Sequence, residues 1–212
     1  MKVTFTNSTP SRIGLPDVLS VKLPETHLPN HASANINPRY TFPNGGILPL
    51  TSEQGPIYEA VLKGDVGGLF EGVNITVMAY GQTGSGKTYS CTGGESYKSR
   101  GLIPLALEDV FETRTNIESR SVTGGLAVKI YVRFVEVYNE SCYDLLEEGK
   151  RFKDVSSWEK LRVGQTKEGG SFVRGARTYE CMNEKQALGF LFMGNVNRVV
   201  RETRMNKGSS RR

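Results

Sequence analysis

The chain has 212 residues, a length that favours one domain with a sizeable core, and 24 Gly with 9 Pro indicate many loops. Its net charge of +5 is a mild excess of Lys and Arg, far from the dense basic cluster of a nucleic-acid-binding arm. No apolar run reaches the roughly 18 residues of a membrane span, and the three cysteines are scattered without a metal-binding pair, so we expect a protein of the reducing cytoplasm.

The first 38 residues contain prolines that interrupt any helix, and we expect this segment to be extended or poorly ordered. Further on, Thr51 and Gln54 lie three positions apart, the spacing of a capping box, so a helix is predicted to begin there. Glycines at its far end predict that this helix frays or kinks. These are Gly64, Gly67 and Gly68.

Four later segments have sequence patterns typical of strands or helices. "ITVMAY" (75–80) is a short apolar run typical of a strand buried on both faces, and "LAVKIYVRFVEVY" (126–138) predicts one long strand. "GLIPLALEDVFETR" (101–114) predicts a helix with Pro104 near its start and an apolar stripe of Ile103, Leu107, Val110 and Phe111. Asn183 with Gln186 is predicted to cap another helix, whose apolar side is Ala187, Leu188, Leu191 and Phe192. Interleaved strands and helices favour the α/β class.

The stretch that follows 75–80 carries the chemistry. Residues 81–88 match the phosphate-binding pattern G-x-x-x-x-G-K-[ST], with residues Gly81, Gln82, Thr83, Gly84, Ser85, Gly86, Lys87 and Thr88. The glycines let successive N–H groups turn toward one anion, the lysine supplies a positive charge to the β and γ phosphates, and the threonine hydroxyl can bind Mg²⁺. A nucleoside triphosphate with Mg²⁺ is therefore the first hypothesis, and a glycine-rich turn with an incidental lysine is the alternative. Hydrolysis does not follow from the loop alone.

Several ordered blocks resemble the kinesin motor domain. "AYGQTGSGKTYS" is similar to the kinesin phosphate loop, "GLIPLALEDVF" to the Gly-Ile-Ile-Pro helix, and "FVEVYNESCYDLL" to the segment that ends in Asp-Leu-Leu. "GNVNRVVRETRMNKGSSR" resembles switch I of that family. The resemblance covers residues 40–211 and implies a three-layer P-loop NTPase sheet with helices on both faces. On composition alone, "NKGSSRR" reads as a polar tail.

The resemblance also implies roles for individual residues. Tyr89 occupies the place of the residue that flanks the adenine, and a tyrosine ring can stack on a base. Asn206, Ser209 and Ser210 match the switch I residues that sense the γ-phosphate, and Ser210 joins Thr88 at the metal. Arg211 matches the arginine that pairs with a switch II glutamate. The implied cofactors are ATP and Mg²⁺, and the implied partner is the microtubule in the cytoplasmic cytoskeleton.

The sequence departs from the family pattern in three places. No Arg-x-Arg-Pro strand precedes the loop, Arg212 occupies the place of a serine, and no Asp-x-Ala-Gly-x-Glu switch II motif follows. We therefore expect a divergent segment at 1–38 and a partial motor domain at 39–212, without the C-terminal half that makes most of the microtubule contact. The alternatives are a non-motile, degenerate kinesin-like binding module and an unrelated P-loop NTPase.

Overall fold

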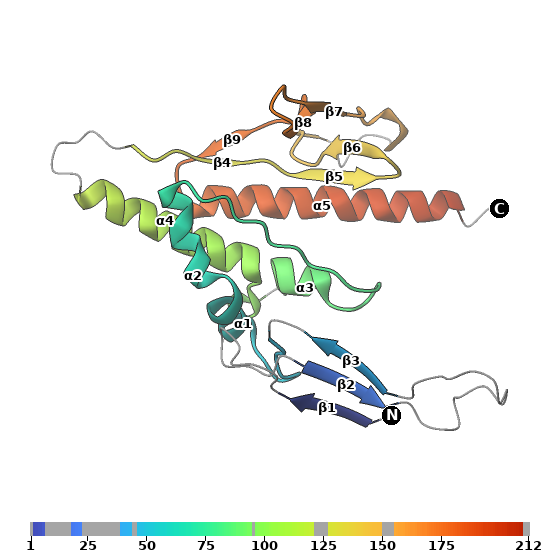
Figure 1. Ribbon diagram of the computed structural model, residues 1–212. Helices are drawn as coiled ribbons and strands as arrows, with labels where there is room; N and C mark the ends of the chain where they lie inside the picture. The colour runs from blue at the N-terminus through green and yellow to red at the C-terminus, as the bar shows by residue number, and fades with distance from the viewer. Residues whose placement is uncertain are drawn as a thin grey trace. The chain divides into compact units, whose positions relative to one another are not determined.

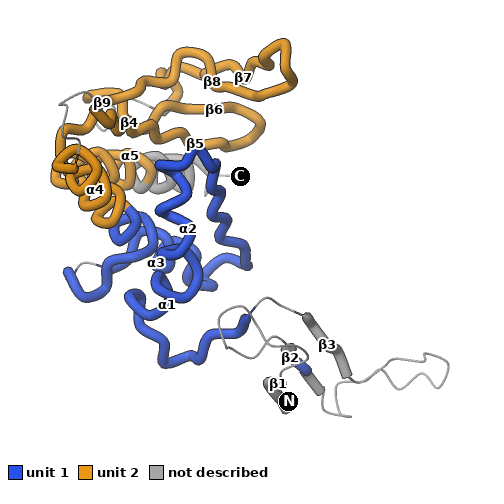
Figure 2. The backbone as a smooth tube through the Cα atoms, turned by 60° about the vertical axis from the view of Figure 1, so that its left-hand side comes forward, with its two compact units in different colours: residues 1–106 blue, residues 107–212 orange. Residues whose placement is uncertain are grey.

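The computed structural model describes residues 2–6, 18–22, 39–43, 46–94, 96–120, 127–149 and 155–209. For most of the first three strands and for residues 199–209, it describes the backbone only. The chain divides into two compact units, residues 1–106 and residues 107–212, which are coloured separately in Figure 2.

Along the described chain, three short strands are followed by the helices α1 to α4, then by the strands β4 to β9, and last by helix α5 (Figure 1). Both kinds of element are present, and the α/β class is confirmed. The helices are α1 (Gln54–Val61), α2 (Lys63–Val66), α3 (Lys87–Thr92), α4 (Leu102–Arg120) and α5 (Glu184–Ser209), with 3₁₀ turns η2 (Gly67–Glu71), η3 (Tyr97–Ser99) and η5 (Val155–Ser157). The strands are β1 (Lys2–Thr6), β2 (Val18–Lys22), β3 (Arg39–Pro43), β4 (Ile130–Val132), β5 (Val135–Tyr138), β6 (Ser141–Asp144), β7 (Arg162–Gln165), β8 (Ser171–Arg174) and β9 (Tyr179–Cys181). Within the described residues the strands form small antiparallel sheets, in the orders β1-β2-β3, β4-β9, β5-β6 and β7-β8.

In the first unit, β2 is the central strand of the three-stranded sheet. Both of its pairings are antiparallel. Lys22, the last residue of β2, lies opposite Lys2 and Arg39, which are the first residues of β1 and β3. Pro43 ends β3, which is an edge strand, a position where proline is tolerated in a sheet. The strands β1 and β2 fall within the proline-rich segment 1–38.

The helix expected after Thr51 is present as α1, but the predicted capping box is not formed. Its N-cap is Glu53, and no side chain caps it. Instead Gln54 is buried and begins a buried stripe that continues at intervals of four residues. The stripe consists of Gln54, Tyr58, Leu62 and Val66. The helix breaks at Leu62 (φ −136°) and turns into a 3₁₀ form at Gly67, so the predicted kink near the glycines is confirmed.

The strand predicted at 75–80 is wrong, because residues 73–80 have no strand structure. Their apolar side chains face solvent, with 50% of Val77, 82% of Met78 and 96% of Tyr80 exposed. An apolar strand buried on both faces needs a neighbour on each side. None of the sheets formed by the described residues supplies one.

The helix predicted from Gly101 is confirmed as α4, although its apolar face is rotated by one residue at its start. Leu102 is buried, whereas the predicted Ile103 is 40% exposed. Phe111 is buried and contacts Cys181 and Ala187 in the core of the second unit, where Leu107 packs against it. Burial also raises the pKa of the Cys181 thiol, which keeps it protonated.

The single strand predicted over 126–138 is wrong, because the chain forms two strands, β4 and β5, with different partners. β4 pairs with β9, whereas β5 pairs with β6. Between them, Phe134 packs against the buried cluster of Tyr143, Leu145 and Trp158. The change of partner and the inward turn of Phe134 explain why a continuous β-rich sequence does not form one strand.

Helix α5 begins as predicted. Asn183 Oδ1 accepts from the Gln186 N–H at 3.0 Å, and Gln186 Oε1 accepts from the Met182 N–H at 2.8 Å. Ala187 is fully buried, but the predicted Phe192 is 71% exposed. Phe190 points inward in its place and stacks on Tyr179 at 4.5 Å between ring centroids. Figure 1 shows α5 lying along one side of β4, β5 and β9.

Buried polar side chains hold the backbone just after β6. Asp144 Oδ1 accepts from the Leu146 N–H at 2.7 Å, and its Oδ2 accepts from the Arg177 N–H at 2.8 Å. Asn197 of α5 donates through Nδ2 to the Leu145 carbonyl at 2.7 Å, in a buried position. These bonds satisfy backbone groups that water cannot reach, and they fasten α5 to the Asp-Leu-Leu segment.

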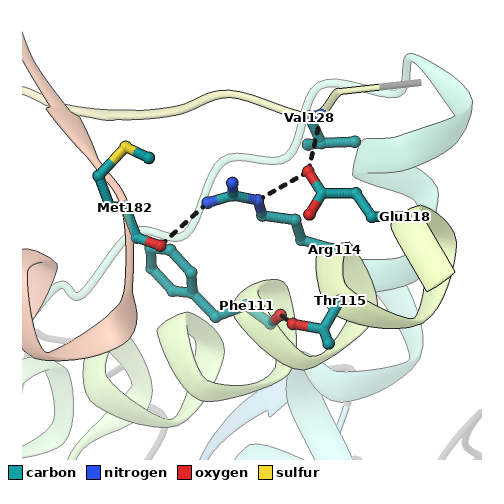
Figure 3. Close-up of polar contacts among 6 residues, drawn as sticks. All are labelled: Phe111, Arg114, Thr115, Glu118, Val128 and Met182. Atoms are coloured by element: carbon teal, nitrogen blue, oxygen red, sulfur yellow. Dashed lines mark hydrogen bonds and ion pairs between the residues drawn. The ribbon is translucent and has the colours of Figure 1, made fainter. Parts of the chain in front are cut away.

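A polar network ties α4 to the start of β4 and to the start of α5 (Figure 3). Arg114 Nε donates to Glu118 Oε1 at 3.0 Å, and Arg114 Nη1 donates to the Met182 carbonyl at 3.2 Å. The same Glu118 oxygen accepts from the Val128 N–H at 3.1 Å. The hydrogen bond from Arg114 and then the bond from Val128 hold the pKa of Glu118 below its ordinary value, because both favour the charged carboxylate.

Candidate phosphate-binding site

The predicted phosphate loop lies in the first unit, after the exposed segment 73–80 and directly before α3. Its middle is a turn in which the Ser85 N–H donates to the Gln82 carbonyl at 3.2 Å. Helix α3 begins at Lys87 with Gly86 as its N-cap, so the helix predicted to follow the loop is present. The loop therefore leads into a helix as the motif requires, although the strand before it is not formed.

Each of the three glycines of the loop lies where a side chain would be strained or would collide with a neighbour. Gly84 and Gly86 have φ values of 80° and 89°, in the left-handed region that favours glycine. At Gly81 a Cβ atom would collide with the Ser85 side chain. The backbone shape of the loop thus depends on glycine at these positions, as the sequence argument requires.

Lys87 places its ammonium group over the beginning of the loop. Its Nζ donates to the Gly81 carbonyl at 2.8 Å and to the Gln82 carbonyl at 2.7 Å. An ammonium group has three N–H donors, so these two contacts leave the charge accessible to a further acceptor. A phosphate group at this loop would meet a positive charge that the loop itself holds in position.

Thr88 and Tyr89 lie side by side in the first turn of α3, and both are exposed. The Thr88 side chain is open to solvent beside Lys87, a position suited to a metal ion that also binds phosphate oxygens. Tyr89 keeps 54% of its surface exposed, which leaves the ring available for stacking. Its carbonyl accepts from Gln54 Nε2 at 2.6 Å and from the Gly93 N–H at 2.8 Å.

The hydrogen bond between Gln54 and the Tyr89 carbonyl was not predicted from the sequence. The spacing of Gln54 from Thr51 suggested a capping role, whereas its amide instead reaches α3, 35 residues further along the chain. The available signal was a polar residue at the head of an otherwise apolar stripe with a period of four.

The predicted switch I residues belong to the second unit. Asn206 and Ser209 lie in the C-terminal part of α5, where only the backbone is described, and its conformation there is helical. Ser210 and Arg211 lie outside the described residues, as does Arg212. Their roles at the γ-phosphate and at the metal therefore stay predictions.

Other features of the described chain give no competing site for this chemistry. Among the described residues, no group of three or more His, Cys, Asp and Glu side chains could hold a metal ion. Mg²⁺ bound through phosphates needs no such cage, so Thr88 and the loop fit it. A cavity of about 260 Å³ lies along α5 and is lined by residues such as Glu148, Phe192 and Met193, none of which was predicted to be functional. In the described part of the chain, no helix is both long and apolar enough to cross a membrane.

Comparison with known proteins shows that most of the chain is similar to one family. The family model described as "Kinesin motor domain" matches residues 15–212 of the chain. Kinesin-like protein KIF9 of Mus musculus is 37% identical over 177 residues, which are 81% of this chain and 21% of that protein. Kinesin-like protein KIN-5A of Arabidopsis thaliana is 32% identical over 215 residues, which are 97% of this chain and 20% of that protein. The chain spans about a fifth of the length of these relatives.

Solved structures have the same fold over part of their length. A chain described as "Structure of a fast kinesin: Implications for ATPase mechanism and interactions with microtubules" aligns with a TM-score of 0.71 and 26% identity. That alignment covers 96% of this chain and 49% of the solved chain. A chain described as "kinesin 6" aligns with a TM-score of 0.60 and 22% identity over 74% of this chain and 52% of that chain. The prediction of a partial α/β motor fold is confirmed.

Proposed function

This chain belongs to the kinesin motor domain family, and from that premise we propose that residues 81–89 bind ATP with Mg²⁺ in a motor ATPase that moves along microtubules. The observation that carries the proposal is the loop geometry, with left-handed glycines at positions 84 and 86 and the Lys87 ammonium held over the loop. Nucleotide binding is proposed for this chain, and hydrolysis and movement for the motor of which these residues form part.

Each loop residue has a part in holding the nucleotide. Lys87 would exchange one or both carbonyl contacts for β and γ phosphate oxygens, which are stronger partners because they are charged. The Thr88 hydroxyl would ligate Mg²⁺, which supplies positive charge to the phosphates when bound. Tyr89 would stack on the adenine, using the exposed part of its ring.

The reaction we propose is in-line attack of water on the γ-phosphate. It needs positioning and charge stabilisation and no covalent nucleophile. Asn206, Ser209 and Ser210 would sense the γ-phosphate, and Arg211 would pair with a switch II carboxylate. Loss of the γ-phosphate would release this segment, a change that can be coupled to the grip on a track.

The partner we propose is the microtubule, and the location is the cytoplasmic cytoskeleton. The support is family membership together with the net charge of +5, which suits an acidic track. The alternative of a non-motile binding module rests only on the departures in sequence and is not favoured.

A titration with a fluorescent ATP analogue tests the binding step. Lys87→Ala should lower the affinity by about tenfold or more, because hydrogen bonds to charged groups contribute about 1.5–3 kcal/mol. Lys63→Ala is the matched control, since Lys63 is an exposed lysine of the same unit whose Nζ pairs with Glu59 at 2.6 Å. Equal affinities for the wild-type chain and the Lys87 variant would refute the assignment of the loop.

A further inference from the structure

Gln54 is a polar side chain buried at the start of an otherwise apolar stripe of α1 and α2. Only 3% of its surface is exposed, and it leads the stripe formed with Tyr58, Leu62 and Val66. Its Nε2 donates to the Tyr89 carbonyl at 2.6 Å, while its Oε1 is buried with no hydrogen-bond partner. An unsatisfied buried acceptor costs about 1–3 kcal/mol, so an apolar residue would serve the packing of α1 better than glutamine does.

The bond that Gln54 makes is directed at one place in the candidate site. The Tyr89 carbonyl already accepts from the Gly93 N–H at 2.8 Å, which closes the last turn of α3. Gln54 adds a second donor to the same oxygen, and so joins that turn to α1. A Cβ on Gly94 would lie 3.5 Å from Cε2 of Tyr89, so the tyrosine ring passes close to the backbone there. The backbone of Tyr89 is thus held by two hydrogen bonds to its carbonyl, one from Gln54 and one from Gly93.

The phosphate end of α3 is held independently of Gln54. Lys87 is fastened by the carbonyls of Gly81 and Gln82, which belong to the loop itself. Loss of the Gln54 amide would therefore loosen the backbone that carries the tyrosine ring and leave the lysine contacts in place.

We infer that Gln54 is a positioning residue for the base-binding end of the nucleotide site. Its amide fixes the backbone of Tyr89 so that the exposed ring can stack on the purine. The inference rests on the proposed function, because it presupposes that the loop binds a nucleotide. It predicts that Gln54 affects ligands that contain a base and does not affect ligands that are phosphate alone.

The experiment compares two ligands, ATP and inorganic tripolyphosphate, each with Mg²⁺, by calorimetric titration of the full chain. Gln54→Met, which is similar in length and apolar, should weaken ATP binding about fivefold, the effect of one hydrogen bond of about 1 kcal/mol. Its affinity for tripolyphosphate should equal that of the wild-type chain. Tyr89→Ala should show the same selectivity, and the double variant should bind ATP no more weakly than Tyr89→Ala.

A second variant distinguishes loss of the hydrogen bond from a general effect on folding. Gln54→Glu keeps the shape of the side chain, but its carboxylate cannot donate to the Tyr89 carbonyl until it is protonated. Its ATP affinity relative to the wild-type chain should therefore recover as the pH is lowered, while its relative tripolyphosphate affinity should not change.

The outcomes separate the inference from the proposed function. An equal loss of affinity for both ligands in Gln54→Met, or no loss for either, would overturn the positioning role while the loop assignment survives. Additive losses in the double variant would overturn it as well. A wild-type chain that binds neither ligand, or a Lys87→Ala variant that binds both normally, would instead refute the proposed function and the inference with it.

Discussion

Gly194 in α5 gives the sharpest test of the packing in the second unit. In an ordinary helix interior, replacing glycine by alanine gains about 1 kcal/mol, because alanine loses less backbone entropy on folding. Here the added Cβ would overlap Cδ1 of Phe134 and would lie 2.5 Å from Cε1 and 2.9 Å from Cγ. The ring atoms nearest the backbone are involved, so the ring cannot simply swing aside.

Forcing a methyl group into such a contact costs about 1–3 kcal/mol, and the close overlap places Gly194→Ala toward the upper part of this range. After subtraction of the helix gain, we expect a net loss of about 1–2 kcal/mol in the free energy of unfolding. Gly189→Ala is the matched control, because a Cβ on Gly189 of the same helix meets nothing within 4 Å. That variant should be more stable than the wild-type chain by about 0.5–1 kcal/mol.

Urea unfolding followed by Trp158 fluorescence measures both variants. Trp158 is the single tryptophan of the chain and is buried in the cluster that Phe134 packs against. In a Phe134→Ala background the Gly194→Ala change should become stabilising, because the obstructing ring is gone. Equal shifts for the Gly189 and Gly194 variants, or a Gly194 effect that persists without the ring, would refute the packing argument.

Three further predictions follow from the bonds and backbone angles described above. Glu118→Gln should destabilise the chain at neutral pH and have little effect in acid. Because the pKa of Glu118 is lowered in the folded chain, the charged carboxylate stabilises the fold above the ordinary pKa of 4.5, and this stabilisation disappears as the pH falls through the folded pKa. Urea unfolding at several pH values would measure it. Asn197→Ala should cost about 1–3 kcal/mol, because it removes the donor to a buried carbonyl, and an unchanged urea midpoint would contradict this. Gly86→Ala should lose about 1–2 kcal/mol, because its φ is 89°, and should also weaken ATP binding, whereas Gly64→Ala, with no close neighbour and no strained φ, should do neither.

The parts of the structure that could be predicted are those governed by neighbours in the sequence. The glycine angles at Gly84 and Gly86 follow from the local pattern of the phosphate loop, and the Asn183 cap of α5 follows from a three-residue spacing. Helix α4 was recognisable from its period. In each case the physical cause acts over a few residues, so the sequence contains it directly.

The parts that could not be predicted depend on partners far along the chain. Residues 75–80 are apolar enough for a buried strand, but a strand also needs neighbours, and the described residues offer none. The segment 126–138 divides because β4 and β5 pair with different strands. Gln54 was assigned to a cap because its real acceptor, the Tyr89 carbonyl, lies 35 residues away.

The anchoring of Lys87 by the Gly81 and Gln82 carbonyls has a consequence for affinity. A free lysine side chain has about 2 kcal/mol of rotamer entropy, most of which an anion would have to remove on binding. In this loop that entropy is already lost when the chain folds, because two hydrogen bonds hold the ammonium group. Phosphate binding then becomes an exchange of neutral acceptors for charged ones at a preorganised donor. The loop carbonyls thus act both as anchor and as competitor, and the strength with which they hold the lysine limits how tightly the phosphate can bind.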